Sequence, residues 1–261
     1  MTASGGPKPR KIGLALGGGA VLGAAHIGIL KAFEEKGIKI DCISGTSIGA
    51  FIAGLYAFGI SPPEIEKRVA DVSWLDISGF TIPKYGLLSN EKLGEMLKAE
   101  LGDAAVENAA ISLALVATDI GKGEKVVARR GNLAQYVMAS TCIPGIFSPV
   151  TIDGRMLVDG GLLENVPVSP LKSMGADITV GVDLNANRSY KDPEDIIDVL
   201  VNAIDITIDN ATRLQVDGAD FLIAPDVNAY NRNDADAVSD LIEVGYNSGL
   251  DAVLRIKEQL Y

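Results

Sequence analysis

The sequence has one histidine, two cysteines and few basic residues, and each shortage argues against a class of protein. Cys42 and Cys142 are too few for a disulfide framework, which favours a reducing compartment. Lys and Arg number 23 against 34 Asp and Glu, so the formal net charge is −11 and no long basic run is present. This charge argues against nucleic acid as a partner, because phosphate binding needs clustered positive charge.

The start of the sequence shows no pattern typical of a targeting segment. The first eleven residues are polar, so we expect no cleaved signal peptide and a cytoplasmic protein. The apolar run over 43–60 is about as long as a short membrane span, but it contains Ser44, Thr46 and Ser47 besides several glycines. We interpret this run as a buried strand, turn and helix. Any contact with lipid is then expected to be local, apolar and peripheral to the membrane, since an anionic surface would repel the acidic chain.

Glycines at the ends of short apolar runs predict alternating strands and helices. The first sixty residues predict four elements: a strand over 12–16, a helix over 20–36, a strand over 39–44 and a helix over 47–58. This order favours a parallel sheet covered by helices on both faces. Because no linker or break in composition is present, we predict a flexible tail over 1–10 and a single domain over 11–261.

The rest of the chain continues the same mixture of strands and helices. Helices are predicted from Pro62 and over 90–101, 132–140, 192–216 and 235–260. Strands are predicted over 112–119, 124–128, 177–184 and 221–224, and a hairpin over 151–159 that turns at Asp153-Gly154. The segments 74–89 and 141–150 are expected to be apolar loops. The first of these, with Trp74 and Phe80, is interpreted either as the border of an acyl channel or lipid contact, or as a loop packed on the core.

The segment Gly45-Thr46-Ser47-Ile48-Gly49 fits the pattern G-x-S-x-G at a predicted strand-to-helix turn. Such a turn is sharp and exposes the serine oxygen above the sheet, while Gly45 and Gly49 let neighbouring backbone segments approach. The N-terminus of the following helix favours developing negative charge. This context favours Ser47 as a nucleophile over Ser47 as a structural turn residue.

The segment Gly17-Gly18-Gly19-Ala20 also lies between a predicted strand and a helix, and three interpretations stay open. In a dinucleotide fingerprint, Gly17 and Gly19 fit and Asp41 follows at about the spacing of a ribose-binding acid, but Leu22 stands where a third glycine belongs. In an oxyanion cradle, the backbone amides point at one reaction centre. The third interpretation is close packing of a strand against a helix.

A serine nucleophile needs a base, and His26 is the one histidine. It lies one turn inside the first helix, where we interpret it as a packed, hydrogen-bonded core residue. A carboxylate is the alternative base. Asp159 ends a predicted strand and precedes Gly160 and Gly161, which permit an unusual turn. The motif alone leaves Asp159 open as a turn residue or as the base of a Ser-Asp dyad.

Together these residues resemble the patatin-like phospholipase family over roughly 11–225. Four motifs stand in the family's order: the glycine-rich loop with Gly23-Ala24-Ala25-His26-Ile27-Gly28, then Gly45-Thr46-Ser47-Ile48-Gly49, then Ser140-Thr141-Cys142-Ile143-Pro144-Gly145-Ile146-Phe147, and Leu157-Val158-Asp159-Gly160-Gly161 followed by Asn165-Val166-Pro167-Val168. The sequence is most similar to bacterial members described as esterases of the RssA or NTE-like type. Several ordered motifs are far more specific than any one of them.

The resemblance implies a three-layer α/β/α fold of the FabD/lysophospholipase-like kind, with a mainly parallel central sheet. It implies a serine esterase with a catalytic dyad of Ser47 and Asp159, and no metal or organic cofactor. It also implies an oxyanion hole made by the backbone amides of Gly18, Gly19, Ala20 and Ile48. The implied substrates are phospholipids, lysophospholipids or other acyl esters, as for a phospholipase A or lysophospholipase.

Two positions depart from the family's usual loop, G-G-G-x-R/K-G. Ala20 replaces a glycine and restricts positive φ, and Leu22 replaces a basic residue. These departures keep a second hypothesis open, a catalytically weak or inactive lipid-binding or regulatory relative. A nucleotide-binding oxidoreductase is the alternative from another class. An acyltransferase is disfavoured, because it would be expected to use a histidine well downstream of the serine.

Overall fold

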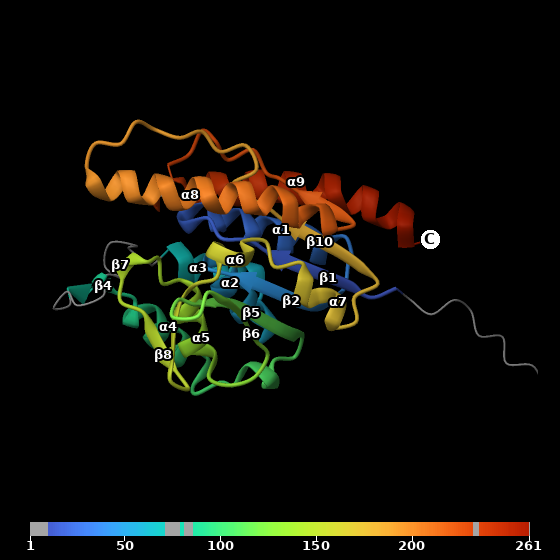
Figure 1. The fold of residues 1–261 in the computed structure, drawn as a ribbon. Helices are drawn as coiled ribbons and strands as arrows, with labels where there is room; N and C mark the ends of the chain where they lie inside the picture. Colours follow the sequence, from blue (N-terminus) through green and yellow to red (C-terminus); the bar gives the residue numbers. More distant parts are fainter. Residues whose placement is uncertain (1–9, 71–78, 81–85, 232–234, 261) are drawn as a thin grey trace, which may run out of the picture.

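The computed structural model describes residues 10–70, 79–80, 86–231 and 235–260, and its centre is an eight-stranded sheet (Figure 1). The strands of this sheet are β1 (Ile12–Leu16), β2 (Ile40–Thr46), β5 (Ser112–Asp119), β6 (Glu124–Ala128), β8 (Val150–Ile152), β9 (Arg155–Asp159), β10 (Ile178–Val182) and β11 (Phe221–Ile223). Their order is β11-β10-β1-β2-β5-β9-β8, and β6 also pairs with β5. The first five strands in this order are parallel, while β6, β8 and β9 pair antiparallel. The mainly parallel sheet confirms the predicted α/β class.

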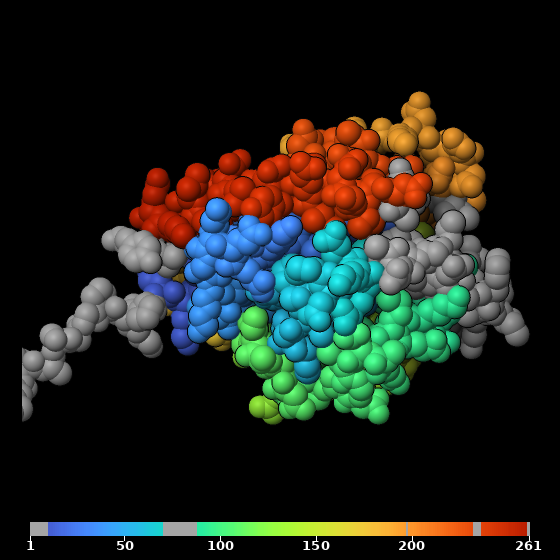
Figure 2. Space-filling model, turned by 180° about the vertical axis from the view of Figure 1, so that it is seen from behind, coloured from blue at the N-terminus to red at the C-terminus, as the bar shows by residue number. Residues whose placement is uncertain are grey.

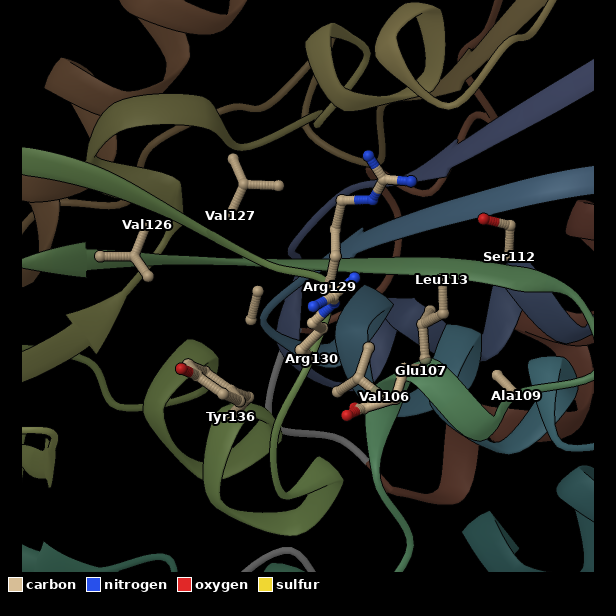
Figure 3. Close-up of a pocket in the computed structure, with 11 residues that line it drawn as sticks. Val106, Glu107, Ala109, Ser112, Leu113, Val126, Val127, Arg129, Arg130 and Tyr136 are labelled. Atoms are coloured by element: carbon tan, nitrogen blue, oxygen red, sulfur yellow. The ribbon is translucent and has the colours of Figure 1, made fainter.

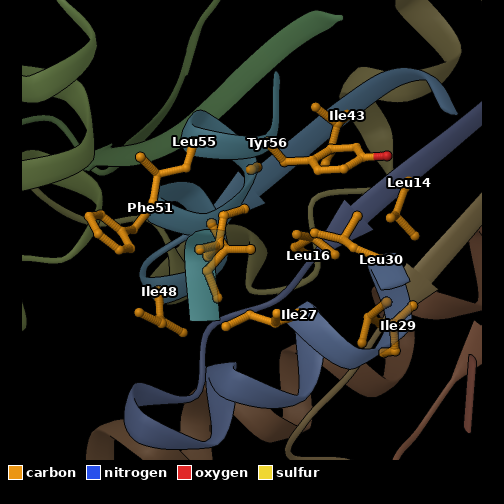
Figure 4. Packing of buried hydrophobic residues seen from close by; sticks show 14 of the residues in the cluster. Leu14, Leu16, Ile27, Ile29, Leu30, Ile43, Ile48, Phe51, Leu55 and Tyr56 are labelled. Atoms are coloured by element: carbon orange, nitrogen blue, oxygen red, sulfur yellow. The ribbon is translucent and has the colours of Figure 1, made fainter. Parts of the chain in front are cut away.

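Side chains of β1 alternate between two apolar cores, one on each face of the sheet. Leu14 and Leu16 belong to the larger core, whereas Ala15 belongs to a smaller one with Val166 and Leu171. This alternation follows from the two-residue period of a strand, and it means that both faces are covered. Apolar side chains of the sheet and of the helices on that face pack against one another in the larger core (Figure 4).

Helices lie on both faces of the sheet. The larger core is formed with α1 (Ala24–Glu35), α2 (Ile48–Ala57), α3 (Pro62–Ala70) and α9 (Val238–Leu260). The other face carries α6 (Gly161–Glu164), α7 (Ser169–Ser173) and α8 (Ile196–Gln215), with α8 packed on α6. The remaining helices are α4 (Glu91–Leu101), α5 (Leu133–Ser140) and the short 3₁₀ segments η1 (Ala20–Gly23), η2 (Val106–Asn108), η3 (Val216–Gly218) and η4 (Ala235–Ala237). The layers are therefore α/β/α, as predicted.

The helices α1 and α9 lie side by side (Figure 2), and they approach closely because both contain glycine at the crossing. A Cβ atom added to Gly28 would lie 2.0 Å from the carbonyl oxygen of Ile242, and one added to Gly245 would lie 1.9 Å from the carbonyl oxygen of Ala25. No side chain fits such gaps, so the two backbones are in direct contact. This contact fixes α1, whose first turn follows the glycine-rich loop.

Several predicted elements are confirmed and two predicted loops are wrong. The turn residues Asp153 and Gly154 have φ values of 50° and 73°, as the predicted hairpin turn requires. The segment predicted as a loop over 74–89 contains the strands β3 (Gly79–Phe80) and β4 (Gly86–Ser89), which pair antiparallel. The segment predicted as a loop over 141–150 contains β7 (Gly145–Phe147), which pairs in parallel with β4. Neither β4 nor β7 is long enough to show a periodic pattern, and their pairing joins distant segments. Most of the first loop, including Trp74, lies outside the described residues.

The predicted helix over 20–36 begins as the 3₁₀ turn η1 and becomes α-helical at Ala24. The predicted tail over 1–10 lies outside the described residues except for Arg10, which donates hydrogen bonds to backbone oxygens. Across the described ranges, no helix is long and apolar enough to cross a membrane. The apolar run over 43–60 is instead β2 followed by the buried helix α2, as predicted.

Candidate active site

The turn between β2 and α2 places Ser47 at the carboxyl edge of the sheet. Its backbone has φ 55° and ψ −128°, a conformation that residues with a side chain rarely adopt. The flanking glycines allow this turn: a Cβ atom on Gly45 would lie 2.4 Å from the carbonyl oxygen of Gly49, and one on Gly49 would lie 2.1 Å from that of Leu16. The predicted strand–turn–helix context of G-x-S-x-G is therefore confirmed.

One side chain from outside the turn holds the Ser47 backbone. The amide of Ser47 donates a hydrogen bond of 2.8 Å to Oγ of Ser140, and this hydroxyl donates at 2.6 Å to the carbonyl oxygen of Val116. Ser140 is fully buried, whereas Ser47 is half-buried. The sequence alone does not mark Ser140 as a site residue, although Ser140 opens one of the motifs that carry the family resemblance. Its hydroxyl links the turn to the neighbouring strand β5.

Strand pairing brings Asp159 close to this turn. Thr46, the last residue of β2, pairs with Val116, and Asp159, the last residue of β9, pairs with the next residue of β5, Ala117. Both β5 residues also pair with β6 on the opposite side. The strands β2 and β9 therefore lie one after the other along the same edge of β5, and their ends meet. Ser47 and Asp159 are brought together by this arrangement although 112 positions separate them.

The turn after Asp159 orients its carboxylate. The oxygen Oδ1 accepts a hydrogen bond of 2.7 Å from the amide of Gly161, and the side chain is 7% exposed. Gly160 is required here because a Cβ atom would lie 2.2 Å from the carbonyl oxygen of Val116. The Asp-Gly-Gly motif thus bends the chain directly against β5. A buried acid held by one backbone amide can act as a proton acceptor for a hydroxyl within reach.

Cys142 lies beside Asp159 but has the properties of an unreactive thiol. Its carbonyl oxygen accepts a hydrogen bond of 2.8 Å from the amide of Asp159. Burial, and after it the negative charge of Asp159, raise the pKa of the thiol to about 12. Since the thiolate is the nucleophilic form, Cys142 stays protonated and inert at neutral pH. The serine is therefore the nucleophile candidate at this edge.

The glycine-rich loop lies directly against Ser47. A Cβ atom added to Gly18 would lie 3.1 Å from Cβ of Ser47. The amide of Gly18 donates at 3.1 Å to Oδ1 of Asn165, and its carbonyl oxygen accepts at 2.9 Å from Nδ2 of Asn185. Ala20 has φ 53°, so the alanine adopts the conformation in which the family loop has glycine. Neither asparagine was selected as a site residue from the sequence, because both are far from the loop along the chain.

Three of the four predicted oxyanion amides have no acceptor within the described part of the chain. Ile48 is the first residue of α2, and first-turn amides have no partner in their own helix. The amides of Gly19 and Ala20, at the start of η1, likewise donate to no described residue. The amide of Gly18 differs, because Asn165 accepts its hydrogen bond. The edge therefore offers unpaired donors close to the serine, as anion binding requires.

His26 is a core residue, as expected. Its ring is fully buried, and Nε2 lies 2.8 Å from the carbonyl oxygen of Gly17, so this nitrogen carries the proton and donates. Burial lowers the pKa of His26 to about 4, although the hydrogen bond to Gly17 opposes that shift. The neutral ring therefore supports the glycine-rich loop from within α1.

The dinucleotide interpretation is wrong. A ribose-binding acid must lie at the carboxyl end of its strand, near the glycine-rich loop. Asp41 instead stands at the start of β2, where Oδ2 accepts a hydrogen bond of 3.0 Å from the amide of Ile12 and Oδ1 forms an ion pair with Lys39. Asp41 therefore lies at the opposite edge of the sheet from the glycine-rich loop. No acid of β2 is therefore placed to bind a ribose beside Gly17.

A cavity of about 600 Å³ is lined by residues of β5, β6 and α5 and of the segments beside them (Figure 3). Its lining includes Ser112 and Leu113 at the start of β5, and Arg129 and Arg130 just after β6. Ser47 lies beyond the opposite end of the segment where β2 pairs with β5. Neither Ser47 nor Asp159 lines this cavity. Among the described residues, no cluster of His, Cys, Asp and Glu side chains is arranged to hold a metal ion.

The fold and the turn at Ser47 define an α/β protein whose G-x-S-x-G serine stands at the carboxyl edge of a mainly parallel sheet. A family model described as patatin-like phospholipase matches residues 14–172, which include the glycine-rich loop, Ser47 and Asp159. The chain belongs to the patatin-like phospholipase family.

Relatives in other organisms agree with this family. An uncharacterised NTE family protein of Mycobacterium tuberculosis is 36% identical over 191 residues, which are 72% of this chain and 53% of that protein. A protein named lysophospholipase NTE1 from Pyricularia oryzae is 28% identical over 284 residues, covering 96% of this chain and 19% of the relative. The chain thus spans about half the length of the first relative and under a fifth of the second.

Solved structures show the same fold at low sequence identity. VipD from Legionella pneumophila superposes with a TM-score of 0.56 at 15% identity, covering 94% of this chain and 66% of VipD. ExoU in its complex with SpcU from Pseudomonas aeruginosa gives a TM-score of 0.50 at 18% identity, covering 95% of this chain and 52% of that chain. These similarities confirm the predicted fold.

Proposed function

We propose that the protein is a serine hydrolase that cleaves carboxylic esters of lipids through Ser47 and Asp159. The single observation that supports this most strongly is the meeting of two strand ends. The strained turn of Ser47 follows Thr46, and Thr46 and Asp159 pair with consecutive residues of β5. Family membership and relatives named lysophospholipases favour lipid esters as the substrates. Phospholipids and lysophospholipids are the proposed substrate class.

In the proposed mechanism, Asp159 accepts the hydroxyl proton of Ser47 while the oxygen attacks the ester carbonyl carbon. The carbonyl oxygen becomes an oxyanion, stabilised by the amides of Gly19, Ala20 and Ile48, since the amide of Gly18 is bound to Asn165. The proton held by Asp159 passes to the leaving alcohol as the C–O bond breaks, which leaves an acyl-enzyme. Asp159 then takes a proton from water, the hydroxyl oxygen attacks the acyl carbon, and Ser47 regains its proton as the acid is released.

Hydrolysis of soluble and lipid esters tests this mechanism. We expect Ser47→Ala and Asp159→Asn each to lower kcat for p-nitrophenyl butyrate and for a lysophospholipid by roughly a thousandfold or more. Ser173→Ala and Asp153→Asn are matched controls, since both residues lie outside the site, and these variants should keep the wild-type rate. Equal rates for wild type and Ser47→Ala would show that the mechanism is wrong.

A second candidate function, a non-catalytic lipid-binding relative, is favoured by the loop that follows β1. Ala20 holds a positive φ against its preference, and Leu22 is buried where the family has a basic residue. For this candidate, the purified protein would bind a lysophospholipid at equilibrium and release no fatty acid over hours. Fatty acid released by wild type and not by Ser47→Ala would exclude it.

We propose that α8 contributes the surface that contacts aggregated lipid. Among the described side chains of α8, five large apolar ones are exposed, including Ile196 and Leu200 in its first half, at 70% and 57%. The helix packs on α6, which follows Asp159, and Cδ1 of Ile208 would lie 3.4 Å from a Cβ atom on Gly161. An exposed apolar surface beside a reaction centre is typical of a lipid or protein contact. The acidic chain favours a zwitterionic lipid over an anionic one.

A comparison of aggregated and soluble substrates tests the role of α8. The double variant Ile196→Asn with Leu200→Asn should lose most activity on micellar lysophosphatidylcholine and keep its activity on soluble p-nitrophenyl butyrate. Leu254→Asn is the matched control, because Leu254 is 67% exposed on α9. Equal loss on both substrates, or no loss on micelles, would contradict this role.

A further inference from the structure

The two peptide units on either side of Gly18 are held by side chains that are distant in sequence. The first unit joins Gly17 to Gly18: its carbonyl oxygen accepts from Nε2 of His26 at 2.8 Å, and its amide donates to Oδ1 of Asn165 at 3.1 Å. The second unit joins Gly18 to Gly19, and its carbonyl oxygen accepts from Nδ2 of Asn185 at 2.9 Å. Both hydrogen-bonding groups of the first unit are therefore occupied, but only the carbonyl of the second.

Planarity of the peptide bond connects these contacts to Gly19. In a trans peptide the carbonyl C=O and the following N–H point in opposite directions and lie in one plane. When Asn185 holds the carbonyl of Gly18, it fixes the direction of the Gly19 amide on the other side of the same plane. This amide donates to no described residue. The first donor left open toward the site is therefore the amide of Gly19, because the amide of Gly18 is bound to Asn165.

Both asparagines are buried and use only one end of their side-chain amide. Asn165 is 4% exposed and Asn185 is 6% exposed. Within the described chain, Nδ2 of Asn165 and Oδ1 of Asn185 have no hydrogen-bond partner. A buried polar atom without a partner is unfavourable and calls for an explanation. In the folded chain, these two side chains exchange hydrogen bonds with water for their hydrogen bonds to Gly18.

The backbone around each asparagine is anchored close to the site. Asn165 follows Glu164, whose carbonyl oxygen accepts a hydrogen bond of 2.9 Å from Oγ1 of Thr46, the residue before Ser47. The amide of Asn185 donates at 2.9 Å to Oδ1 of Asp183. These contacts leave the two side chains little freedom to move away from Gly18.

The Asn185 loop is also tied to α8. The carbonyl oxygen of Asn185 accepts at 3.0 Å from the amide of Arg188. Arg188 forms ion pairs of 2.8 Å with Asp205 and 3.3 Å with Asp209, both on α8. The loop after β10 thus holds Asn185, and the end of α6 holds Asn165. Both side chains bind the same residue, Gly18.

We propose that Asn165 and Asn185 are positioning residues that clamp the peptides around Gly18 and aim the amide of Gly19 at the carbonyl oxygen of the substrate. This role rests on the proposed hydrolase function. It assigns the amide of Gly18 to the clamp and makes Gly19 the first donor of the oxyanion hole. Without the clamp the serine would still attack, but the oxyanion would meet a misaligned donor.

Steady-state kinetics of Asn185→Leu, with Asn185→Asp as a second variant in case the first does not fold, tests the clamp. Both changes remove the donor to Gly18. We expect kcat for p-nitrophenyl butyrate to fall about 100-fold, with KM within about twofold, as for loss of one oxyanion donor. Asn165→Leu should act in the same direction. Asp220→Ala is the control, because it removes two hydrogen bonds to Thr179 near β11 and should leave kcat unchanged.

A thionoester substrate separates positioning of the oxyanion hole from a general structural effect. Sulfur accepts hydrogen bonds weakly, so a well-aimed donor makes the ester react much faster than its thiono analogue. The ratio of the two rates should fall in the Asn185 variants. Wild-type kcat in the folded variants, or a lower kcat with an unchanged ratio, would overturn the clamp. Full activity of Ser47→Ala would instead overturn the hydrolase proposal, so the two failures are distinguishable.

Discussion

Two turns at the carboxyl edge of the sheet place non-glycine residues at positive φ, and they are held in different ways. Ser47 has φ 55° and Ala20 has φ 53°. The turn at Ser47 is held by backbone contacts: glycines on both sides leave no room for a Cβ atom, and one hydroxyl supports its amide. The loop before Ala20 is held by hydrogen bonds between its backbone and the side chains of His26, Asn165 and Asn185.

The two turns differ in how far along the chain the groups that hold them lie. The glycines that make the turn at Ser47 possible lie within a few positions of it, and a single distant hydroxyl, that of Ser140, supports its amide. The glycine-rich loop needs groups from α1, from the segment after α6 and from the segment after β10. We therefore expect the first turn to be sensitive to added volume and the second to be sensitive to loss or protonation of a polar group.

Added volume at Gly49 should have the largest effect. The new Cβ atom in Gly49→Ala would lie 2.1 Å from the backbone oxygen of Leu16, which cannot move without shifting β1. We expect a loss of roughly 3 kcal/mol or more in the free energy of unfolding, measured by urea denaturation. Gly54→Ala on the same helix is the control, because its nearest contact is an ordinary 3.4 Å. The control should gain up to about 1 kcal/mol from helix propensity, and equal stability of both variants would contradict backbone packing as the cause.

Removal of the Ser140 hydroxyl should have the next largest effect. Ser140→Ala leaves the amide of Ser47 and the carbonyl of Val116 without this partner. We expect the free energy of unfolding to fall by about 2–3 kcal/mol, together with a lower kcat because the turn at Ser47 loosens. Ser173→Ala removes a single surface hydrogen bond to Pro170 and serves as the control. If Ser140→Ala matches this control in stability and rate, the proposed support of the turn is absent.

Acid should weaken the glycine-rich loop through His26. The unfolded chain has an ordinary histidine pKa of 6.5, whereas burial lowers the folded pKa to about 4. Protonation therefore favours the unfolded chain: the contribution of His26 is complete above about pH 6.5 and is lost as the pH falls toward 4. Between pH 7 and pH 5 this loss is about 2 kcal/mol.

The variant His26→Gln isolates this effect of pH. It lacks the titrating ring, so its free energy of unfolding should change less than that of wild type between pH 7 and pH 5. The measurement is a urea midpoint at each pH for both proteins. Identical changes in the two proteins would mean that other groups cause the acid sensitivity.

Relief of strain at Ala20 should have the smallest effect. A residue with a Cβ atom in the left-handed region is disfavoured by about 1–2 kcal/mol relative to glycine, and the entropy of glycine in the unfolded chain offsets part of this. Ala20→Gly should therefore raise the free energy of unfolding by about 1 kcal/mol or less, measured as a small increase in Tm. Ala57→Gly, within α2, should lower Tm. A lower Tm for Ala20→Gly as well would show that Ala20 is not strained.

The same difference explains how much of the site could be predicted from the sequence. Ser47 is recognisable because its glycines, strand and helix are all local, and Asp159 because it ends a strand before two glycines. Asn165 lies in a motif that carries the family resemblance, but nothing local shows that its side chain binds Gly18. Asn185 belongs to no such motif, so only the packing of the segment after β10 onto the loop reveals it.

Local sequence patterns also decide which parts of the fold can be predicted. Elements with a clear period and a clear end, such as β1, α2 and the hairpin at Asp153, were predicted within a few residues. The strands β4 and β7 lie in segments that the sequence predicts as loops, because two ladder pairs between distant segments leave no periodic pattern. Short helices such as α6 and α7 follow from the turns around Gly160 and Pro170, which the sequence analysis did not assign to helices.

The most direct test of the central claim is the mass of the protein after reaction with a fluorophosphonate, which modifies activated serines. Wild type should gain one adduct, and peptide mapping should place it on Ser47. Ser47→Ala should gain none, and Asp159→Asn should react far more slowly than wild type. An unmodified wild type, an adduct on another residue, or equal labelling of Ser47→Ala would contradict the assignment of Ser47 as the nucleophile.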